Sequence, residues 1–127
     1  MAYQSPVDVL RSARARLATP GGWLHASPHQ ATNAHGEGCR AYDDGAVAWD
    51  VYAALLAAKS GDAALDTALG FVAVAAGLRT EVVKPLDLEV FDEVLRWQDD
   101  PHRALSAVLS ALDRAIDLAV AAAAGAT

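Results

Sequence analysis

The chain has 127 residues, which is enough for one compact domain and too few for a cofactor domain beside a substrate domain. Hydrophobic residues make up 54% of the sequence, but 30 of them are Ala, which buries little area. Ten Lys and Arg against sixteen Asp and Glu give a net charge of −6, which argues against an electrostatic grip on nucleic acid or anionic lipid. We therefore expect one helical domain over residues 1–127, with no direct binding to nucleic acid or membrane.

The first helix has a clear start signal. Ser5 can accept a free backbone amide, Pro6 lacks an N–H group at a position that does not need one, and Asp8 places an acid in the first turn. Apolar residues then recur at helical spacing to about Ala18, where the sequence Thr-Pro-Gly-Gly ends the helix. The arginines of this helix are interpreted as a solvated face: Arg11, Arg14 and Arg16.

Between Trp23 and Ala41 the helical period disappears and Gly and Pro recur. This pattern predicts a small β-hairpin or an irregular insertion that turns near His35-Gly36. Residues 42–45 (Tyr-Asp-Asp-Gly) are expected to cap a second helix, from Ala46 to about Ala58.

Three more helices are predicted in the second half of the chain. Asp62 is expected to cap the third, which ends at Gly77, and Asp87 to cap the fourth, from Leu88 to about Trp97. Residues 78–85 between them contain two adjacent Val and end in Pro, a pattern that fits a short strand or an extended connector. The expected fold is mainly α, with four to five helices around one core.

The last helix has the most regular pattern. We expect Asp100 to be its N-cap and Pro101 its first residue, followed by about 22 residues with one apolar stripe. The tail Ala121–Thr127 has high helix propensity but almost no packing material, so we expect it to fray.

Four residues in the irregular segment have side chains that zinc prefers: His25, His29, His35 and Cys39. Their spacings match no well-defined zinc module, so ordinary loop composition is the leading interpretation and no cofactor is expected. Cys39 is the only cysteine, which excludes an internal disulfide and predicts a reducing, cytoplasmic setting. The sequence shows no basic start followed by an apolar run, the pattern that would indicate a targeting or membrane segment, and we expect neither.

No catalytic residue can be assigned. The sequence lacks a nucleophile elbow and a phosphate-binding glycine loop, and its adjacent acid pairs stand mostly where helix caps are expected. Asp50 lies in an apolar run, and an unpaired carboxylate would be costly to bury there. We favour an exposed edge or a structural ion pair for Asp50.

A large aromatic residue and a dense polar turn coincide at residues 97–102. Trp beside such a turn can anchor a protein partner, although a Trp that plugs the edge of the core is the commoner case. The candidate partner-binding residues are Trp23, Trp97, Gln98, Asp99 and His102.

Several motifs resemble an uncharacterised family of small actinobacterial and phage proteins, known as a domain of unknown function. The motifs are Gly22-Trp23, the pattern AV-x-W-x-x-x-AAL over Ala46–Leu55, and the block from Trp97 to Ile116, which is the specific part. Where such proteins commonly have Trp-Asn-Asp this chain has Trp97-Gln98-Asp99, and Asp50 replaces a common Cys. The resemblance implies a similar architecture and a phage or mobile-element origin, and it transfers no catalytic residue.

These observations favour a non-enzymatic acidic protein that acts by binding another protein, with a homodimer as one form of partnership. Ala-rich helices permit close helix contact and thus self-association. The first alternative is an anti-defence inhibitor that mimics nucleic-acid charge through the acidic segment 81–100. The second is a zinc-binding enzyme or sensor that uses the His and Cys side chains of the loop.

Overall fold

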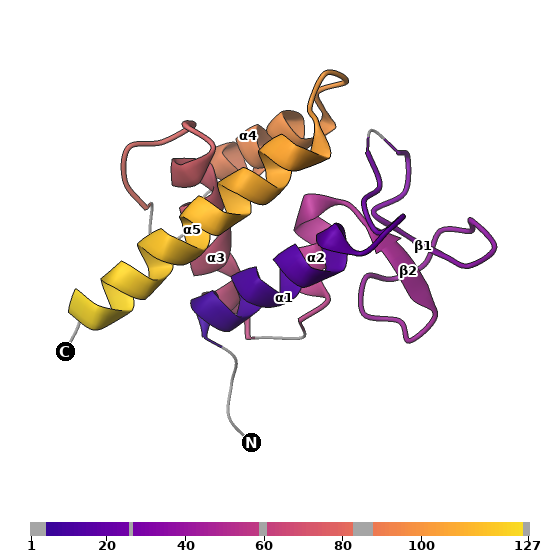
Figure 1. Ribbon diagram of the computed structural model, residues 1–127, viewed down its shortest axis with the longest axis horizontal. Coiled ribbons are helices and arrows are strands. Elements are labelled where there is room, and N and C mark those ends of the chain that lie inside the picture. Colours follow the sequence, from indigo (N-terminus) through magenta and orange to yellow (C-terminus); the bar gives the residue numbers. More distant parts are fainter. Residues whose placement is uncertain (1–4, 26, 59–60, 83–87, 126–127) are drawn as a thin grey trace.

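The computed structural model describes residues 5–25, 27–58, 61–82 and 88–125. In chain order the elements are α1 (Pro6–Ala18), β1 (Ala31–Asn33), β2 (Ala46–Trp49), α2 (Val51–Leu56), α3 (Asp62–Ala75), α4 (Leu88–Asp99) and α5 (Leu105–Gly125) (Figure 1). The strands pair antiparallel as a two-stranded sheet. The expected fold class, mainly α with a small β insertion, is confirmed.

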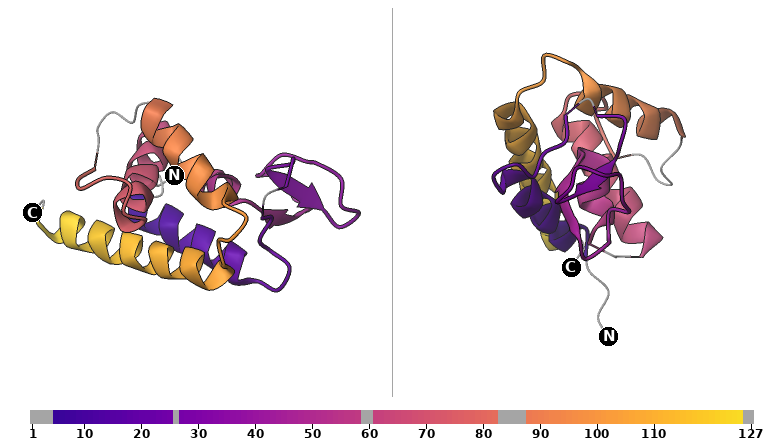
Figure 2. Two further views of the ribbon diagram at one scale, coloured as in Figure 1. Left: turned by 90° about the horizontal axis from the view of Figure 1, so that it is seen from above. Right: turned by 90° about the vertical axis from the view of Figure 1, so that its right-hand side faces the viewer.

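The long helix α5 runs beside α1 and α3, and the β insertion projects from the end of the molecule opposite to the C-terminal end of α5 (Figures 1 and 2). Buried side chains from all five helices form one apolar cluster, whose largest fully buried members are Leu10, Leu17, Leu55, Leu69 and Leu112. A smaller cluster of four alanines, with Cys39, Trp49 and Leu56 packed against it, joins the insertion to α2. The insertion is thus attached to the helical body through residues near α2.

Helix α1 begins as its sequence predicts. The Ser5 hydroxyl accepts the Asp8 N–H group and the Asp8 carboxylate accepts the Ser5 N–H group, which completes a capping box. On the outer side, Arg14 donates to Asp113 of α5 at 2.6 Å. The C-terminal turn of α1 carries Arg16 toward the β insertion.

The predicted second helix is partly wrong. Ala46–Trp49 is strand β2, which pairs with Ala31–Asn33, and helix α2 begins only at Val51. Asp50 is the actual N-cap, since its carboxylate accepts the Ala53 N–H group at 2.7 Å. The predicted helix includes β2 because apolar residues stand on both sides of Asp50, so the pattern of apolar residues does not show where the helix begins. The predicted turn near His35-Gly36 is confirmed, with Gly36 in the left-handed region at φ 77°.

The predicted cap of the third helix is wrong by one residue, because Gly61 is the N-cap and Asp62 is the first residue of α3 (Asp62–Ala75). Gly77 follows its end with φ 80°. Residues 78–82 form no strand in the part of this connector that the structure describes. The predicted cap Asp87 lies outside the described residues, and α4 extends two residues beyond the expected Trp97 end.

The expected start of the last helix is wrong. Residues 100–104 form a turn in which the Asp100 carboxylate accepts the His102 N–H group, and α5 begins at Leu105. At the other end the helix continues through Gly125, residues 126–127 lie outside the described residues, and the fraying of this tail stays a prediction. Alanine is the strongest helix former, and Ala119, Ala122 and Ala123 line a groove with Val7 and Phe71 that places this end beside α1 and α3.

None of the described helices has the length and apolar character needed to cross a membrane.

Candidate functional site

The turn after α4 places two predicted partner-binding residues inside and two outside. Trp97 is 9% exposed and Gln98 is 2% exposed, whereas Asp99 and His102 lie at the surface. Arg103 covers the Trp97 ring at 4.9 Å and donates from Nε to the Trp97 carbonyl. A partner at this turn would meet Asp99 and His102 first.

Trp23 joins the same region through His25. The two rings stack with centroids 4.4 Å apart, and His25 Nε2 lies 2.6 Å from the Asp100 carbonyl oxygen. The Trp23 indole N–H is buried with no acceptor among the described residues. The structure therefore brings Trp23 close to the turn after α4, and the partner-binding role of this set stays a prediction.

Gln98 contacts the buried residue Asp50 beneath this turn. The Gln98 side-chain oxygen accepts the Tyr52 N–H group at 3.0 Å, and its amide hydrogen-bonds the Asp50 carboxylate. Asp50 is 8% exposed and is held by hydrogen bonds rather than by an ion pair, so the expected edge or ion-pair role is corrected. Asp50 and Gln98 are also the two positions that depart from the resembled pattern, and they lie in contact.

Burial has a clear effect on Asp50. Desolvation raises the pKa of Asp50 to about 6, and the nearby Asp99 charge adds to the rise. The hydrogen bonds from Ala53 and Gln98 act in the opposite direction and lower the pKa. The Asp50 carboxylate is engaged at the start of α2. Asp50 does not line the groove beside the C-terminal end of α5, the depression at His29 and Cys39, or the pocket of Arg16 and Trp49 described below. Its role in this structure is to cap α2 and to hold α4 against it.

The four predicted metal ligands are spread over the insertion. His25 is stacked on Trp23, His35 lies in the exposed turn, and His29 and Cys39 line one shallow depression. Burial, followed by the Asp43 charge, raises the pKa of the Cys39 thiol, which disfavours the thiolate that a metal requires. Across the described ranges, no group of three or more His, Cys, Asp or Glu side chains is placed to hold a metal ion.

Zinc binding is tested by metal analysis. For protein purified without a His-tag and dialysed against micromolar zinc, we expect far less than one zinc per chain, because a closed site needs three or four ligands around one point. Stoichiometric zinc that is lost in a His29→Ala variant would contradict this expectation and restore the metal-site hypothesis.

The acidic segment 81–100 is partly neutralised. Arg79 lies 3.0 Å from Glu93 and 3.6 Å from Glu89, so two of its carboxylates face a guanidinium instead of standing free. This pairing does not favour a surface that imitates the charge of nucleic acid, and the mimicry hypothesis stays untested.

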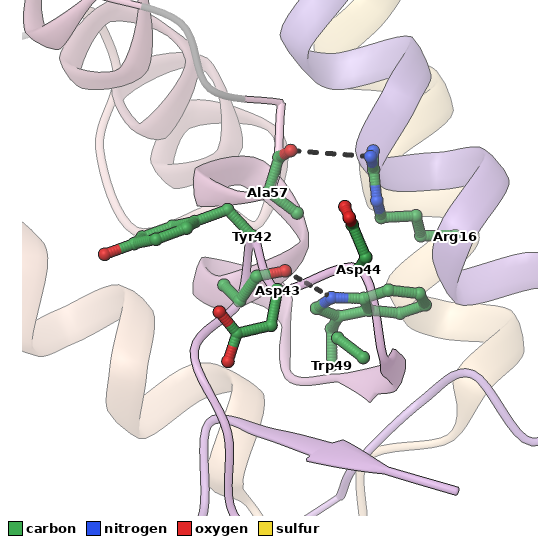
Figure 3. A pocket seen from close by; sticks show the side chains of 8 residues that line it. Arg16, Tyr42, Asp43, Asp44, Trp49 and Ala57 are labelled. Atoms are coloured by element: carbon green, nitrogen blue, oxygen red, sulfur yellow. Dashed lines mark hydrogen bonds between the residues drawn. The ribbon is translucent and has the colours of Figure 1, made fainter.

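A polar pocket of about 300 Å³ lies where α1, the β insertion and α2 meet. Arg16 comes from the last turn of α1, Trp49 from the end of β2, and Ala57 from the residue after α2 (Figure 3). The loop before β2 contributes three further lining residues: Tyr42, Asp43 and Asp44. The backbone of residues 22–24 fixes Trp49, because Trp49 N–H donates to the Gly22 carbonyl at 2.8 Å.

Arg16 is a half-buried cation with neutral partners. It donates from Nη1 to the hydroxyl and carbonyl of Ser12, and from Nη2 to the Ala57 carbonyl at 3.4 Å. Its guanidinium carbon lies 5.7 Å from the centre of the Trp49 ring. No ion pair to it occurs among the described residues, and desolvation lowers its pKa. No described carboxylate therefore lies within ion-pair distance of this positive charge.

The two acids of the loop are used differently. The Asp43 carboxylate accepts the Arg40 N–H group at 3.0 Å and closes the turn that leads into β2. Asp44 is exposed and makes no hydrogen bond or ion pair to another residue in the described part of the chain. Figure 3 shows the Asp44 carboxylate turned toward the side of the pocket that holds Arg16, and that of Asp43 turned away.

Sequence reasoning missed this pocket. The local pattern of the first helix indicates a solvated face for Arg16, and the pattern around Trp49 fits a helix, so neither residue is predicted to line a pocket. The sequence carries no signal for the strand, because Ala46–Trp49 is apolar throughout; only in the structure is Ala48 buried and Val47 exposed, as in a strand.

The structure is that of a small, mainly α protein with a β insertion and a polar surface pocket. No group of side chains placed to hold a metal ion occurs in the described part of the chain. The chain belongs to a family of unknown function, DUF6197, whose model matches residues 1–118. No curated protein matches the chain. No solved structure matches it either.

Proposed function

We propose that the protein acts in the cytoplasm by binding another protein, without catalysing a reaction, and that the partner docks around the pocket of Arg16 and Trp49. The observation that supports this is the joint placement of Arg16, Tyr42 and Trp49 at one opening. Arg, Trp and Tyr are the residue types that most often carry the energy of protein interfaces. Tyr42 is 41% exposed, so a partner can reach it directly.

The position of the perturbed acid supports binding over catalysis. General acid–base chemistry needs a group of shifted pKa within reach of a ligand. Asp50 has such a pKa, but it caps α2 and lines neither this pocket nor the other two. The Arg16 pocket instead offers fixed charges and an aromatic wall, which suit recognition.

Site-directed photocrosslinking tests this function. Tyr42 is replaced by photoreactive p-benzoylphenylalanine in cells that carry the native gene, and Leu88, which is 82% exposed on α4, serves as the control position. We expect a discrete polypeptide adduct from position 42 and none from position 88, followed by direct binding of that polypeptide in purified form. Adducts that form equally at both positions, or at neither, would contradict the proposal.

A second copy of the chain is a second candidate partner, favoured by the C-terminal turns of α5. Leu118 and Val120 are exposed there, and residues 118–125 carry no charged side chain. Two copies of charge −6 could approach along this segment without bringing like charges together. Light scattering measures the molar mass in solution and tests this candidate. A molar mass that stays at that of one chain at high concentration would exclude self-association.

The origin of the chain is a separate proposal. From the resemblance alone, we propose an actinobacterial or phage source, and the genes that flank the coding sequence test it.

A further inference from the structure

Two opposite charges line the Arg16 pocket, those of Arg16 and Asp44. The guanidinium lies beside Ala57, and the carboxylate of Asp44, on the loop before β2, is turned toward the same side of the pocket (Figure 3). The two groups do not form an ion pair with each other, so each keeps hydrogen-bonding capacity toward the space between them.

This layout disfavours a ligand group that carries a net charge. An anion placed against Arg16 would approach the carboxylate of Asp44, and a cation placed against Asp44 would approach the guanidinium of Arg16. A group that accepts hydrogen bonds through one atom and donates them through another satisfies both Arg16 and Asp44 without repulsion. The primary amide of Asn or Gln is the protein side chain with this arrangement.

Trp49 completes the fit. Its indole N–H group already donates to the Ala41 carbonyl at 2.9 Å, so the indole offers its ring rather than a donor to a ligand. An aromatic wall of this kind packs against the methylene groups that carry a side-chain amide. The volume of about 300 Å³ exceeds what one such side chain fills.

We propose that the pocket is a carboxamide site, in which an Asn or Gln side chain of the partner polypeptide places its oxygen on Arg16 and its amino group on Asp44. This inference rests on the proposed function, since it names the group by which the partner is read. The hydrogen bonds to a guanidinium and a carboxylate are charge-assisted, which strengthens both ends of the contact.

Three blocked amino acids of similar size test the charge selectivity: the N-acetyl methylamides of Gln, Glu and Lys. Binding is followed by NMR at the Trp49 indole N–H signal, with the indoles of Trp23 and Trp97 as internal references. We expect the Gln probe to bind with a dissociation constant on the order of 1 mM, and the Glu and Lys probes at least about fivefold more weakly. Equal binding of all three, tighter binding of either ion, or no shift at Trp49 would overturn the proposal.

Two variants separate recognition from folding. Asp44→Ala removes an exposed carboxylate without a described hydrogen bond, and we expect it to weaken the Gln probe about tenfold while it strengthens the Glu probe. Arg16→Gln should weaken the Gln probe and improve the Lys probe. Leu88→Ala on α4 should change none of the three. If Asp44→Ala loses all binding and its spectrum shows an unfolded protein, the loss is a structural effect. The Arg16→Gln variant, which removes the positive charge, then decides. An unchanged order of affinity for the three probes in Arg16→Gln would overturn the proposal.

The probe measurement and the crosslinking experiment can fail independently. A Gln preference without a crosslinked polypeptide would leave the amide site standing and remove the protein partner. If a polypeptide is crosslinked and binds the purified protein, but the Trp49 signal shows no preference for the Gln probe, the proposed function stands and the carboxamide site is overturned.

Discussion

The Asp50→Asn variant is expected to lose a pH dependence of about 3 kcal/mol in the free energy of unfolding between about pH 4 and pH 7. Burial raises the pKa of Asp50 from 3.8 to about 6 in the folded protein. Between these values the folded state keeps a proton that the unfolded state has released. This contribution to stability is therefore complete below the unfolded pKa and disappears as the pH rises through 6.

Urea unfolding at several pH values measures the effect. The stability of the wild type minus that of Asp50→Asn should fall as the pH rises through this window, because Asn cannot titrate. Asp117→Asn, which removes an exposed carboxylate on α5, controls for the change in net charge. If wild type and Asp50→Asn keep a constant difference from pH 4 to pH 7, Asp50 does not titrate in the way that its burial requires.

Gly22→Ala is expected to destabilise the protein by about 1–3 kcal/mol. A Cβ atom at Gly22 would overlap the carbonyl oxygen of Arg16 and lie 3.0 Å from that of Thr19. Both atoms belong to the backbone at the end of α1, so relief requires movement of the helix end away from the segment that bonds Trp49. The same movement would separate Arg16 from Trp49 and open the pocket.

Gly45→Ala is the matched control for this substitution. Its Cβ atom would meet nothing within 4 Å, and it lies in the loop beside the pocket, so we expect a change in stability within about 0.5 kcal/mol. The midpoint of urea unfolding compares the two variants. Equal midpoints for Gly22→Ala and Gly45→Ala would mean that the close approach of the α1 end to Gly22 does not exist in solution.

Local signals predicted the fold where the responsible atoms are neighbours in sequence. Ser5, Pro6 and Asp8 act within one turn, so the start of α1 could be inferred from the sequence. Asp100-Pro101 has equally good local chemistry, but the Asp100 carboxylate closes a turn with His102 instead, and α5 starts later. Whether a capping residue serves a helix or a turn depends on the packing of the chain that follows.

The strand β2 and the candidate site depend on contacts between distant segments. Ala46–Trp49 becomes a strand because Ala31–Asn33 lies beside it, and its apolar residues alone fit a helix equally well. Arg16 and Trp49 meet only because the segment 22–24 returns along the end of β2. No spacing rule within one element could therefore have paired these two residues, whereas Trp97 and the polar turn after it are neighbours in sequence and form a local cluster.

The affinity of the crosslinked polypeptide for purified variants tests most directly whether the pocket of Arg16 and Trp49 is the docking surface. Isothermal titration calorimetry should show a loss of about thirtyfold in affinity for Tyr42→Ala, with no change for Leu88→Ala on α4. Equal affinities of wild type and Tyr42→Ala, with Leu88→Ala weakened instead, would place the interface elsewhere and contradict the account.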